Sequence, residues 1–525
     1  MSLRIGIDVG GTNTDAVLMD GSRVIAKIKT PTTEDVSSGI STALRHVLES
    51  SGTPTAEISG VMIGTTHFTN AVVERRRLQP TVAVRLGLPA TAALPPMVDW
   101  PVDLAAALGR HRHLCHGGHE FDGREISAFD EDEVRRIGAD IAAKGISAIA
   151  VSSVFSPVNA DMEERAAEVL LREVPGASVT LSHEIGRIGL LERENAAILN
   201  ACLRHLATET VTAFQRSIAE MGIGAPLYLT QNDGTLMSAD FAERYPVLTF
   251  ASGPTNSMRG AAFLSGLKDA MVVDVGGTTS DVGALTHGFP REASVAVDIG
   301  GVRTNFRMPD VYSFGLGGGS LVRSDPFRIG PQSVGYRITE QALVFGGDVL
   351  TTTDVAVAAG VAKIGDPSRV RHLDRALVTA AMDRIQEMTE AAVDRMKTSA
   401  EPIPVIAVGG GSVLIARPIA GASEMVKPDH FEAANAVGAA IAQISGEVDR
   451  VYALNGLSRE QAIDDAKAEA SAKAVDAGAD ASTIQIVDIE DVPLAYLPGN
   501  ATRIRVKAVG DLTLAGAREQ GAPRA

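Results

Sequence analysis

Cysteines and aromatic residues are scarce in this sequence. Only two of its 525 residues are cysteine, Cys115 and Cys202, and aromatic residues make up 4% of the chain. Two cysteines cannot build a disulfide framework, so we expect a reducing compartment and a cytoplasmic location. A membrane-spanning helix needs roughly 18–20 apolar residues in one run, and no such run occurs here, so we expect no membrane partner. Because the strand pattern RIGIDV begins at residue 4, we also expect no signal peptide.

Positive charge is scarce as well. The chain has 48 Lys and Arg against 64 Asp and Glu, which gives a net charge of −16. An acidic surface repels the phosphates of nucleic acids and argues against a nucleic-acid partner. A small anionic ligand remains compatible with this charge, because backbone N–H groups and a metal ion supply local positive potential. The length predicts roughly two to four domains.

One glycine-rich decapeptide occurs twice. It reads GIDVGGTNTD at 6–15 and VVDVGGTTSD at 272–281, and each copy follows a short apolar strand pattern. Neither copy has the helix-opening G-x-G-x-x-G of dinucleotide sites or the GKS or GKT of a Walker loop. We interpret each copy as a hairpin whose tight turn exposes N–H groups to a phosphate. The alternative, that a glycine pair is only a turn, fits one copy better than two matched copies.

Outside the repeat, apolar spacing predicts alternating strands and helices. The first copy is followed by two predicted strands joined by an Asp20-Gly21 turn, so the chain opens as a β-meander. We expect an N-terminal part over 1–245 with an insert at about 80–180, a second part over 246–455, and a small C-terminal α+β region over 456–525. Within the insert, a loop rich in Pro, His and Gly is predicted between the strand TVAVRLGL and the helix that begins near DEDEV.

The paired decapeptides resemble the phosphate hairpins of the actin-like ATPase superfamily, which includes sugar kinases, Hsp70-type chaperones and actin. The resemblance implies a two-lobed α/β fold of duplicated RNase H-like domains, with one hairpin from each lobe on ATP in the cleft. AVGGGSVLI at 407–415 resembles the adenosine motif of that superfamily and stands in the expected order.

Four longer segments resemble the hydantoinase/oxoprolinase family, in particular its hydantoinase A-like subunit. They are IGTTHFTNAVVERR at 63–76, SHEIGRIGLLERENAAILNACL at 182–203, LTQNDGTLMSADFAERYPVLTFASGP at 229–254 and GLGGGSLVR at 315–323. The family implies an ATP-dependent hydrolase that phosphorylates the carbonyl oxygen of a cyclic amide, such as a hydantoin, oxoproline or a lactam, before ring opening. A small-molecule kinase and an ATP-dependent ketone carboxylase subunit remain the alternatives. A chaperone-like nucleotide switch would need a peptide-binding domain, for which the C-terminal region looks too small.

The resemblance implies roles for particular residues, with ATP and Mg²⁺ (or Mn²⁺) as cofactors. Four aspartates are expected to be catalytic, and two of them, Asp8 and Asp274, to hold the metal through water; the four are Asp8, Asp15, Asp274 and Asp281. The nucleotide would be cradled by Gly10, Gly11, Thr12, Asn13, Thr14, Gly276, Gly277, Thr278, Thr279, Ser280, Gly317, Gly318, Gly409, Gly410, Gly411 and Ser412. Four further residues would face the substrate, namely Thr65, Thr66, His67 and Asn70.

A histidine-rich stretch, HRHLCHGGHEFDG at 111–123, has two interpretations. It could be a metal-binding or proton-transfer loop, with His116 and His119 as ligands and Glu120 and Asp122 as added oxygen donors. The alternative is a polar surface loop or a partner contact, and it is favoured because the spacing fits no standard zinc pattern.

The sequence departs from the family pattern in two places. Asp233 stands where the family usually has glycine, and the segment after IGPQSVG reads YRITEQALVFGG. Oxoprolinase-type enzymes continue into a further large domain or pair with a separate subunit. Because this sequence ends where that region would begin, we expect a companion such as a hydantoinase B-like subunit, and an oligomer.

Overall fold

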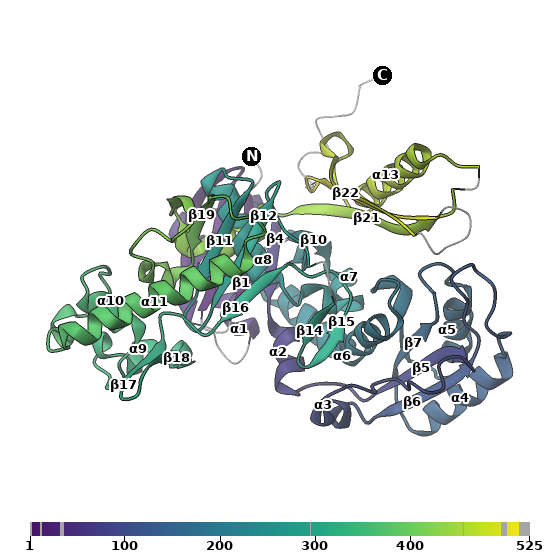
Figure 1. The fold of residues 1–525 in the computed structure, drawn as a ribbon. Helices are drawn as coiled ribbons and strands as arrows, with labels where there is room; N and C mark the ends of the chain where they lie inside the picture. Colours follow the sequence, from purple (N-terminus) through teal and green to yellow (C-terminus); the bar gives the residue numbers. More distant parts are fainter. Residues whose placement is uncertain are drawn as a thin grey trace, which may run out of the picture.

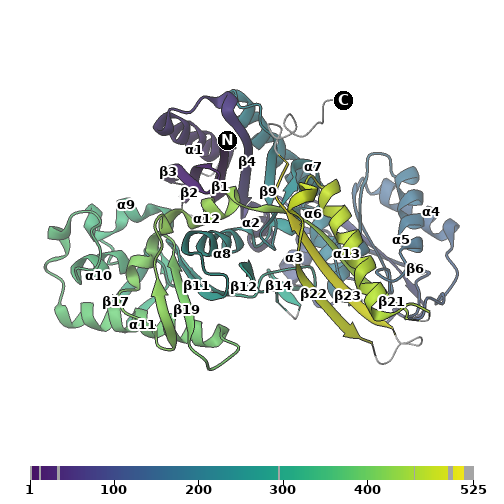
Figure 2. The same ribbon diagram turned by 90° about the horizontal axis from the view of Figure 1, so that it is seen from above.

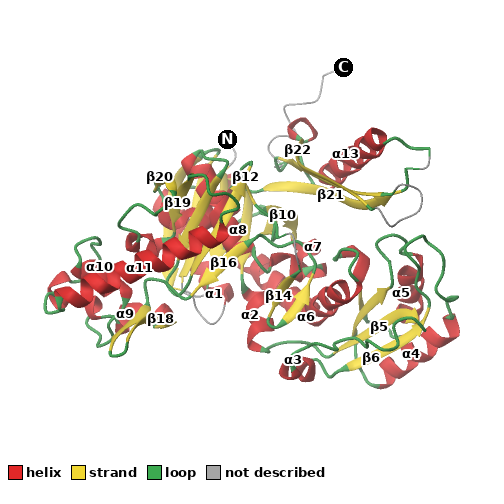
Figure 3. Ribbon diagram, viewed as in Figure 1, coloured by secondary structure: helices red, strands yellow, loops and turns green. Residues whose placement is uncertain are grey.

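The computed structural model describes residues 3–10, 13–31, 36–293, 296–454, 456–494 and 501–513. Within these ranges the chain forms a nine-stranded, a six-stranded and a four-stranded sheet and two small hairpins. Helices cover the sheets, as Figure 3 shows. In Figure 1 the four-stranded sheet lies at the lower right and the C-terminal strands at the upper right. No helix among the described residues is long and apolar enough to cross a bilayer.

The first lobe begins with the predicted meander and adds two parallel strands. Its strands are β1 (Leu3–Val9), β2 (Asn13–Asp20), β3 (Arg23–Pro31), β4 (Ile58–Thr65) and β9 (Leu227–Thr230). β1 to β3 pair antiparallel, while β4 is parallel to β1 and to β9, which gives the order β3-β2-β1-β4-β9. The helix α1 (Val36–Ser51) buries Ile40, Leu44 and Val47 in the core on this sheet.

The second lobe repeats this topology. Its strands are β11 (Ala270–Val275), β12 (Ser280–Thr286), β13 (Phe289–Pro290), β19 (Ile403–Val408) and β20 (Ala422–Val426). Their order is β13-β12-β11-β19-β20, with the same antiparallel and parallel pairs as in the first lobe. The long helix α11 (Arg375–Met396) contributes Ile385 and Val393 to the core of this lobe.

Two helices pack against each other between the lobes. In Figure 2, α8 (Ser252–Ser265) and α12 (Ala434–Ala440) lie between the first-lobe and second-lobe sheets. The backbones touch at glycines: a Cβ on Gly260 would lie 1.8 Å from the Ala434 carbonyl oxygen, and one on Gly438 would lie 1.9 Å from that of Asn256. A side chain at either position would therefore force the two helices apart.

The insert is a separate parallel sheet between two helical layers. Its strands are β5 (Thr81–Leu88), β6 (His111–His116), β7 (Ala148–Ser153) and β8 (Ser178–Leu181), in the order β6-β5-β7-β8. The helices α4 (Glu131–Ala143) and α5 (Asp161–Glu173) share one core with Val82 and Val84 of β5. The long helix α6 (Leu190–Glu220) shares another core with Ala83, which points to the opposite face.

The prediction of a loop at the start of the histidine-rich stretch was wrong. Residues 111–116 form the edge strand β6, which pairs parallel with β5 and buries Cys115 completely. The glycines that suggested a loop flank the strand instead: Gly109, Gly117 and Gly118 have positive φ angles and form its ends. The sequence pattern missed the strand because histidine and arginine occupy its more exposed positions.

The C-terminal strands continue the first-lobe sheet. β10 (Thr235–Ser238) pairs antiparallel with β9 and parallel with β21 (Gln443–Tyr452). β23 (Thr502–Gly510) pairs with β21 and with β22 (Gln485–Pro493), and α13 (Arg459–Asp476) packs on these strands. The domain boundaries predicted at residues 245 and 455 stay predictions. The strand β21, which ends just before residue 455, belongs to a sheet that starts in the first lobe.

The remaining elements are α2 (His67–Glu74), α3 (Val102–Ala107), α7 (Ala239–Arg244), α9 (Ile338–Gln341), α10 (Thr352–Ala358), β14 (Val297–Ile299), β15 (Val302–Thr304), β16 (Val311–Phe314), β17 (Ser320–Ser324) and β18 (Phe327–Ser333). Among them, β16 pairs antiparallel with β12 as the sixth strand of the second-lobe sheet.

Candidate active site

The two copies of the decapeptide form hairpins with the same register. In the first hairpin (β1–β2) Asp8 lies opposite Asp15, and in the second hairpin (β11–β12) Asp274 lies opposite Asp281. The turns close in the same way. The Gly10 N–H donates to the Asn13 carbonyl oxygen at 3.0 Å, and the Gly276 N–H donates to the Thr279 carbonyl oxygen at 2.9 Å. Gly11 and Thr12 lie outside the described residues. The sequence repeat is therefore a structural repeat.

Burial raises the pKa values of all four aspartates. Asp8 and Asp15 are buried, while Asp274 and Asp281 are half-buried. Burial, with the charge of Asp15 adding to it, raises the pKa of Asp8 to about 7. Burial likewise raises the pKa of Asp281 to about 6. It also raises the pKa of Asp274, and that of Asp15 despite the nearby Lys29 ammonium.

The carboxylates of the first hairpin are held by amides and a cation. The Asn435 side chain donates to Asp8 at 3.0 Å and to Asp15 at 3.2 Å. The Asn256 amide donates to Asp8 at 3.4 Å, and the Lys29 ammonium lies 2.6 Å from Asp15. Hydrogen bonds of this kind favour the ionised carboxylate and oppose the effect of burial.

The carboxylates of the second hairpin are held by hydroxyl groups. The Ser257 hydroxyl donates to Asp274 at 2.5 Å, and the Ser313 hydroxyl donates to Asp281. Ser257 follows Asn256 on α8, so one helix supplies a donor to each hairpin. These donors were not predicted from the sequence, in which the TNS triplet at 255–257 after the SGP segment is the only local signal for two of them.

A glycine loop braces the turn of the second hairpin. A Cβ on Gly317 would lie 2.5 Å from the Thr278 nitrogen, and the Gly318 N–H donates to the Gly276 carbonyl at 3.0 Å. The Thr352 hydroxyl in turn donates to the carbonyls of Gly317 and Gly318. These predicted nucleotide-binding glycines therefore lie against the turn and support its shape.

Glycines at the end of a neighbouring strand lie against the first aspartate of each hairpin. Gly409, at the end of β19, has a φ of +83°, and a Cβ there would lie 2.2 Å from Asp274 Oδ1. Gly64, in β4, matches it in the first lobe, where a Cβ would lie 2.7 Å from Asp8 Oδ1. A Cβ on Gly411 would lie 2.6 Å from the Gly276 carbonyl oxygen. The predicted adenosine motif, including Gly410 and the buried Ser412, thus adjoins the second hairpin.

Two predicted cradle hydroxyls are enclosed in the hairpins. Thr14 and Ser280, at corresponding positions of the repeat, are fully buried, and the Ser280 hydroxyl donates to the Leu316 carbonyl at 2.7 Å. By contrast Thr279 is exposed at the tip of its turn, with Gly277 and Thr278 half-buried beside it. The open side of the second turn is therefore formed by 276–279.

The predicted substrate residues lie at the end of β4 and the start of α2. Thr65 is buried, and its backbone N–H and carbonyl both bond to the Ser252 hydroxyl at the start of α8. Thr66 and His67 are half-buried, and the pKa of His67 is lowered by burial and by Arg77. Asn70 is exposed one turn further along the helix.

The two histidines proposed as metal ligands have different partners in the structure. The exposed His116 ring lies 3.1 Å from a Glu133 oxygen, whereas the buried His119 ring lies 3.2 Å from the Asn159 amide. Among the described residues, no three His, Cys, Asp or Glu side chains are grouped so that they could hold a metal ion. A metal at His116 and His119 stays an untested prediction.

Comparison with known proteins assigns the chain to a family. The sequence matches the model of the hydantoinase/oxoprolinase N-terminal region over residues 4–174 and the hydantoinase/oxoprolinase model over residues 193–400. The chain belongs to the hydantoinase/oxoprolinase family. The predicted resemblance is thus confirmed, and the matched regions include both hairpins.

Relatives of this hydantoinase/oxoprolinase chain include two subunits of larger enzymes. Caprolactamase subunit alpha of Pseudomonas jessenii is 26% identical over 419 residues, covering 75% of this chain and 60% of that protein. The acetophenone carboxylase gamma subunit of Aromatoleum aromaticum is 28% identical over 389 residues, covering 68% of this chain and 53% of that protein. The chain therefore spans little more than half of the length of these relatives.

A solved structure shares the fold. ATP-dependent caprolactamase from Pseudomonas jessenii has a TM-score of 0.77 to this chain at 19% identity, covering 97% of this chain and 88% of that chain. Together with the duplicated sheet order, this likeness confirms the predicted two-lobed actin-like α/β fold.

Proposed function

We propose that this chain uses ATP to phosphorylate the carbonyl oxygen of a cyclic amide, as one subunit of a hydantoinase- or oxoprolinase-type hydrolase. The duplicated hairpins carry this proposal, because each presents a glycine turn and a pair of aspartates in the same register. An unstrained amide is a poor electrophile, and phosphorylation of its oxygen makes the ring carbon open to attack by water. Phosphoryl transfer depends mostly on positioning and charge neutralisation, which two hairpins and buried carboxylates can supply.

Magnesium suits the oxygen donors of both hairpins. Among the described residues, Asp15 alone of the four aspartates forms an ion pair, with Lys29. The raised pKa values of Asp8 and Asp274 fit a site that gains a cation together with its nucleotide. Because Mg²⁺ keeps several waters, carboxylates that do not meet at one point can still hold it. When bound, the ion would neutralise charge on the transferred phosphoryl group.

A companion subunit is part of the proposal. The named relatives are subunits, and this chain spans little more than half of their length. We propose that a hydantoinase B-like or other partner completes the reaction after phosphorylation. Both cysteines are free and buried, which fits the cytoplasm as the proposed location.

The test is a measurement of ADP and free phosphate released in the presence of hydantoin, 5-oxoproline or a lactam, with and without the companion subunit. We expect one ring class to stimulate release, and Asp8→Asn and Asp274→Asn to lower it by about 100-fold or more. The exposed Asp99, in the insert, provides the matched control Asp99→Asn. Full turnover in both hairpin variants would refute the site, and the absence of stimulation by every ring would refute the substrate class.

A ketone carboxylase subunit is the second candidate. The acetophenone carboxylase gamma subunit is 28% identical, a value close to the 26% of the caprolactamase subunit. The same hairpins could phosphorylate an enolate oxygen. ATP turnover that requires a ketone and bicarbonate, and ignores cyclic amides, would select this candidate. Phosphate that stays on a released product would instead select a small-molecule kinase.

A further inference from the structure

A cavity of about 790 Å³ lies where the insert, the first lobe and the C-terminal strands meet. Its walls include His183 and Ile185 from the insert, Asn232 and Asp233 from the turn after β9, and Glu447 from β21. Small-molecule sites in proteins commonly occupy roughly 300–1,000 Å³ at such junctions. The size and position of this cavity therefore fit a ligand of that class.

The cavity lies on the edge of the sheet that carries the first hairpin. β1, β4 and β9 are parallel neighbours, so their carboxyl ends lie at one edge. The end of β1 leads into the first turn, the end of β4 carries Thr65, and the end of β9 leads into Asn232 at the cavity wall. Neighbouring strands are about 4.8 Å apart, so β9 lies roughly 10 Å from β1 along this edge. Ligands of α/β sheets bind beyond such carboxyl ends.

Asn232 connects the cavity to the site at the lobe junction. Its side-chain oxygen accepts the Ala251 N–H at 2.8 Å, and its carbonyl accepts the Thr255 hydroxyl at 2.9 Å. These bonds hold the start of α8, where Ser252 bonds to the Thr65 backbone. The helix that reaches the aspartates of both hairpins is thus anchored at the cavity wall.

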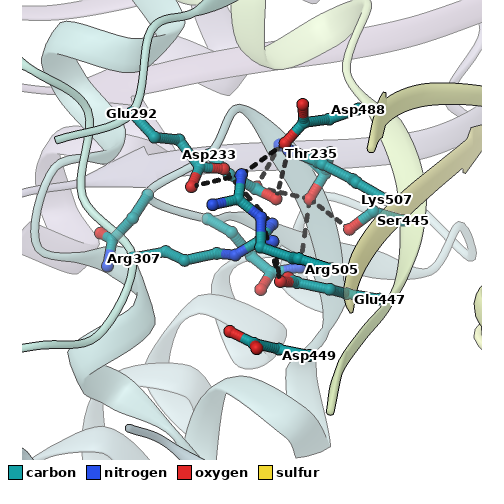
Figure 4. Close-up of polar contacts among 12 residues, drawn as sticks. Asp233, Thr235, Glu292, Arg307, Ser445, Glu447, Asp449, Asp488, Arg505 and Lys507 are labelled. Atoms are coloured by element: carbon teal, nitrogen blue, oxygen red, sulfur yellow. Dashed lines mark hydrogen bonds and ion pairs between the residues drawn. The ribbon is translucent and has the colours of Figure 1, made fainter. Parts of the chain in front are cut away.

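The charges around the cavity pair with one another. Figure 4 shows Asp233 facing Lys507 of β23, at 2.7 Å. Arg307 lies 3.3 Å from Glu292 and also pairs with Glu447. Every charged side chain labelled in Figure 4 has a partner of opposite charge. Asp233, the departure from the family pattern, therefore pairs with a cation of the C-terminal region, and the wall carries no large excess of either charge.

Apolar side chains form a further part of the lining. Leu236, Met237 and Phe306 line the cavity and are almost fully buried. A lining that combines apolar surface with mutually paired charges suits a small molecule with an apolar body and a polar edge, and it disfavours a free phosphate or a polyanion.

A histidine with a fixed orientation faces the cavity. The Nδ1 atom of His183 lies 2.7 Å from Glu163, a carboxylate with no exposed surface. The same carboxylate accepts the Ser182 hydroxyl at 2.5 Å and the Ser153 N–H at 2.7 Å, so its position is fixed. Burial alone would lower the pKa of His183, but the bond to Glu163 and its charge outweigh burial and raise it. With Nδ1 bound to Glu163, the Nε2 atom has a long contact of 4.0 Å to the exposed Glu164 carboxylate, a distance beyond hydrogen bonding that leaves Nε2 open to a ligand.

We propose that this cavity binds the carbonyl compound on which the chain acts, a cyclic amide or its ring-opened acid, with the protonated His183 ring donating a hydrogen bond from Nε2 to the carbonyl oxygen. The ligand class rests on the proposed function. The location rests on the cavity, the shared sheet edge and the Glu163–His183 pair.

The test is calorimetric titration of the full chain, with a non-hydrolysable ATP analogue, using hydantoin, 5-oxoproline and ε-caprolactam as one arm. Their ring-opened acids form the second arm, which distinguishes substrate from product. His183→Asn keeps a side-chain N–H for Glu163 and removes Nε2, so we expect binding about 10-fold weaker. His205→Asn is the matched control, because His205 is an exposed residue of α6 paired with Glu209.

A second variant fills the cavity without disturbing a core. Val158 lines the cavity and is 37% exposed, so Val158→Trp should be accommodated and should weaken binding more than 10-fold. Val102, which is 73% exposed on α3, provides the control Val102→Trp. Thermal melts of all four variants check that they fold.

The outcomes separate this inference from the proposed function. If a ring stimulates ATP turnover but His183→Asn and Val158→Trp behave like their controls, the cavity inference is overturned and the function stands. Binding that both variants weaken, without any stimulated turnover, supports the cavity and overturns the function. Failure of the wild-type chain to bind any ring or acid overturns the inference.

Discussion

The two hairpins have the same backbone register but different side chains around their carboxylates. Asn435 and Lys29 hold the pair of the first hairpin, whereas Ser257 and Ser313 hold the two aspartates of the second. Toward a carboxylate, an amide N–H or an ammonium can only donate, while a hydroxyl can also accept from a protonated carboxyl. The partners of the first hairpin therefore stabilise only the ionised carboxylates, whereas the hydroxyl partners of the second can bond to either protonation state.

The glycines that pack against the first aspartate of each hairpin also differ. Gly409 has a positive φ and packs against backbone as well as against Asp274. A Cβ on Gly409 would lie 2.5 Å from the Val275 carbonyl oxygen. Gly64 approaches Asp8 mainly through side chains, since a Cβ on Gly64 would lie 2.2 Å from the Asn256 amide nitrogen. Side chains can move aside more easily than backbone, so the second hairpin has less freedom to adapt.

The largest effect is expected from a methyl group placed against the second hairpin. Gly409→Ala combines a left-handed φ with a backbone collision, so we expect ATP turnover to fall more than 100-fold, as measured by ADP release. Gly64→Ala should cost about 10-fold, because it displaces mainly side chains. Gly224→Ala is the control, since Gly224 is exposed outside both hairpins and nothing lies within 4 Å of its Cβ position. Equal losses for Gly409→Ala and Gly224→Ala would contradict the comparison.

The second-largest loss of turnover is expected from the Asn435 side-chain amide, which bonds to both aspartates of the first hairpin. Asn435→Ala removes one donor from Asp8 and one from Asp15 at once. A hydrogen bond to a charged group contributes about 1.5–3 kcal/mol, so we expect turnover to fall roughly 10- to 100-fold. Ser257→Ala removes a single donor from Asp274 and should cost less. A larger loss in Ser257→Ala would reverse the assignment of the more charge-dependent hairpin.

The repeat made the fold and the hairpins predictable, because equal spacing of aspartates and glycines leads to equal pairing. The donors Asn256 and Asn435 were not predictable. They lie on α8 and α12, whose position depends on backbone contact at Gly260 and Gly438 rather than on any local pattern. The pairing of β21 with β10 was not predictable either, because it joins segments about two hundred positions apart in the sequence.

The pH dependence of the stability of the ligand-free protein should also distinguish the two hairpins. The folded-state pKa of Asp8 is about 7, against roughly 4 in an unfolded chain. Below pH 4 the carboxyl is protonated in both states, and as the pH rises toward 7 only the unfolded state ionises, so stability falls. Asp8→Asn removes this loss and should melt above wild type at pH 8, with no gain at pH 4.

Asp281→Asn should show the same sign with a smaller gain, because its pKa rises only to about 6. Both measurements use differential scanning calorimetry without nucleotide or metal. A gain at pH 8 that persists at pH 4 would point to packing rather than charge, and a destabilised Asp8→Asn would show that the buried carboxylate is compensated in the folded chain.

The smallest effect is expected from the hydroxyl beside Asp281. Ser313 lowers the pKa of Asp281 by donating to it, so Ser313→Ala should raise that pKa above its value of about 6. If turnover requires ionised Asp281, the acid limb of the pH–rate profile moves to higher pH, while the rate at pH 8 stays within about two-fold of wild type. Asn256→Ala makes the matching change beside Asp8, whose higher pKa should place its acid limb above that of Ser313→Ala. Acid limbs in the opposite order would contradict the higher pKa of Asp8 relative to Asp281.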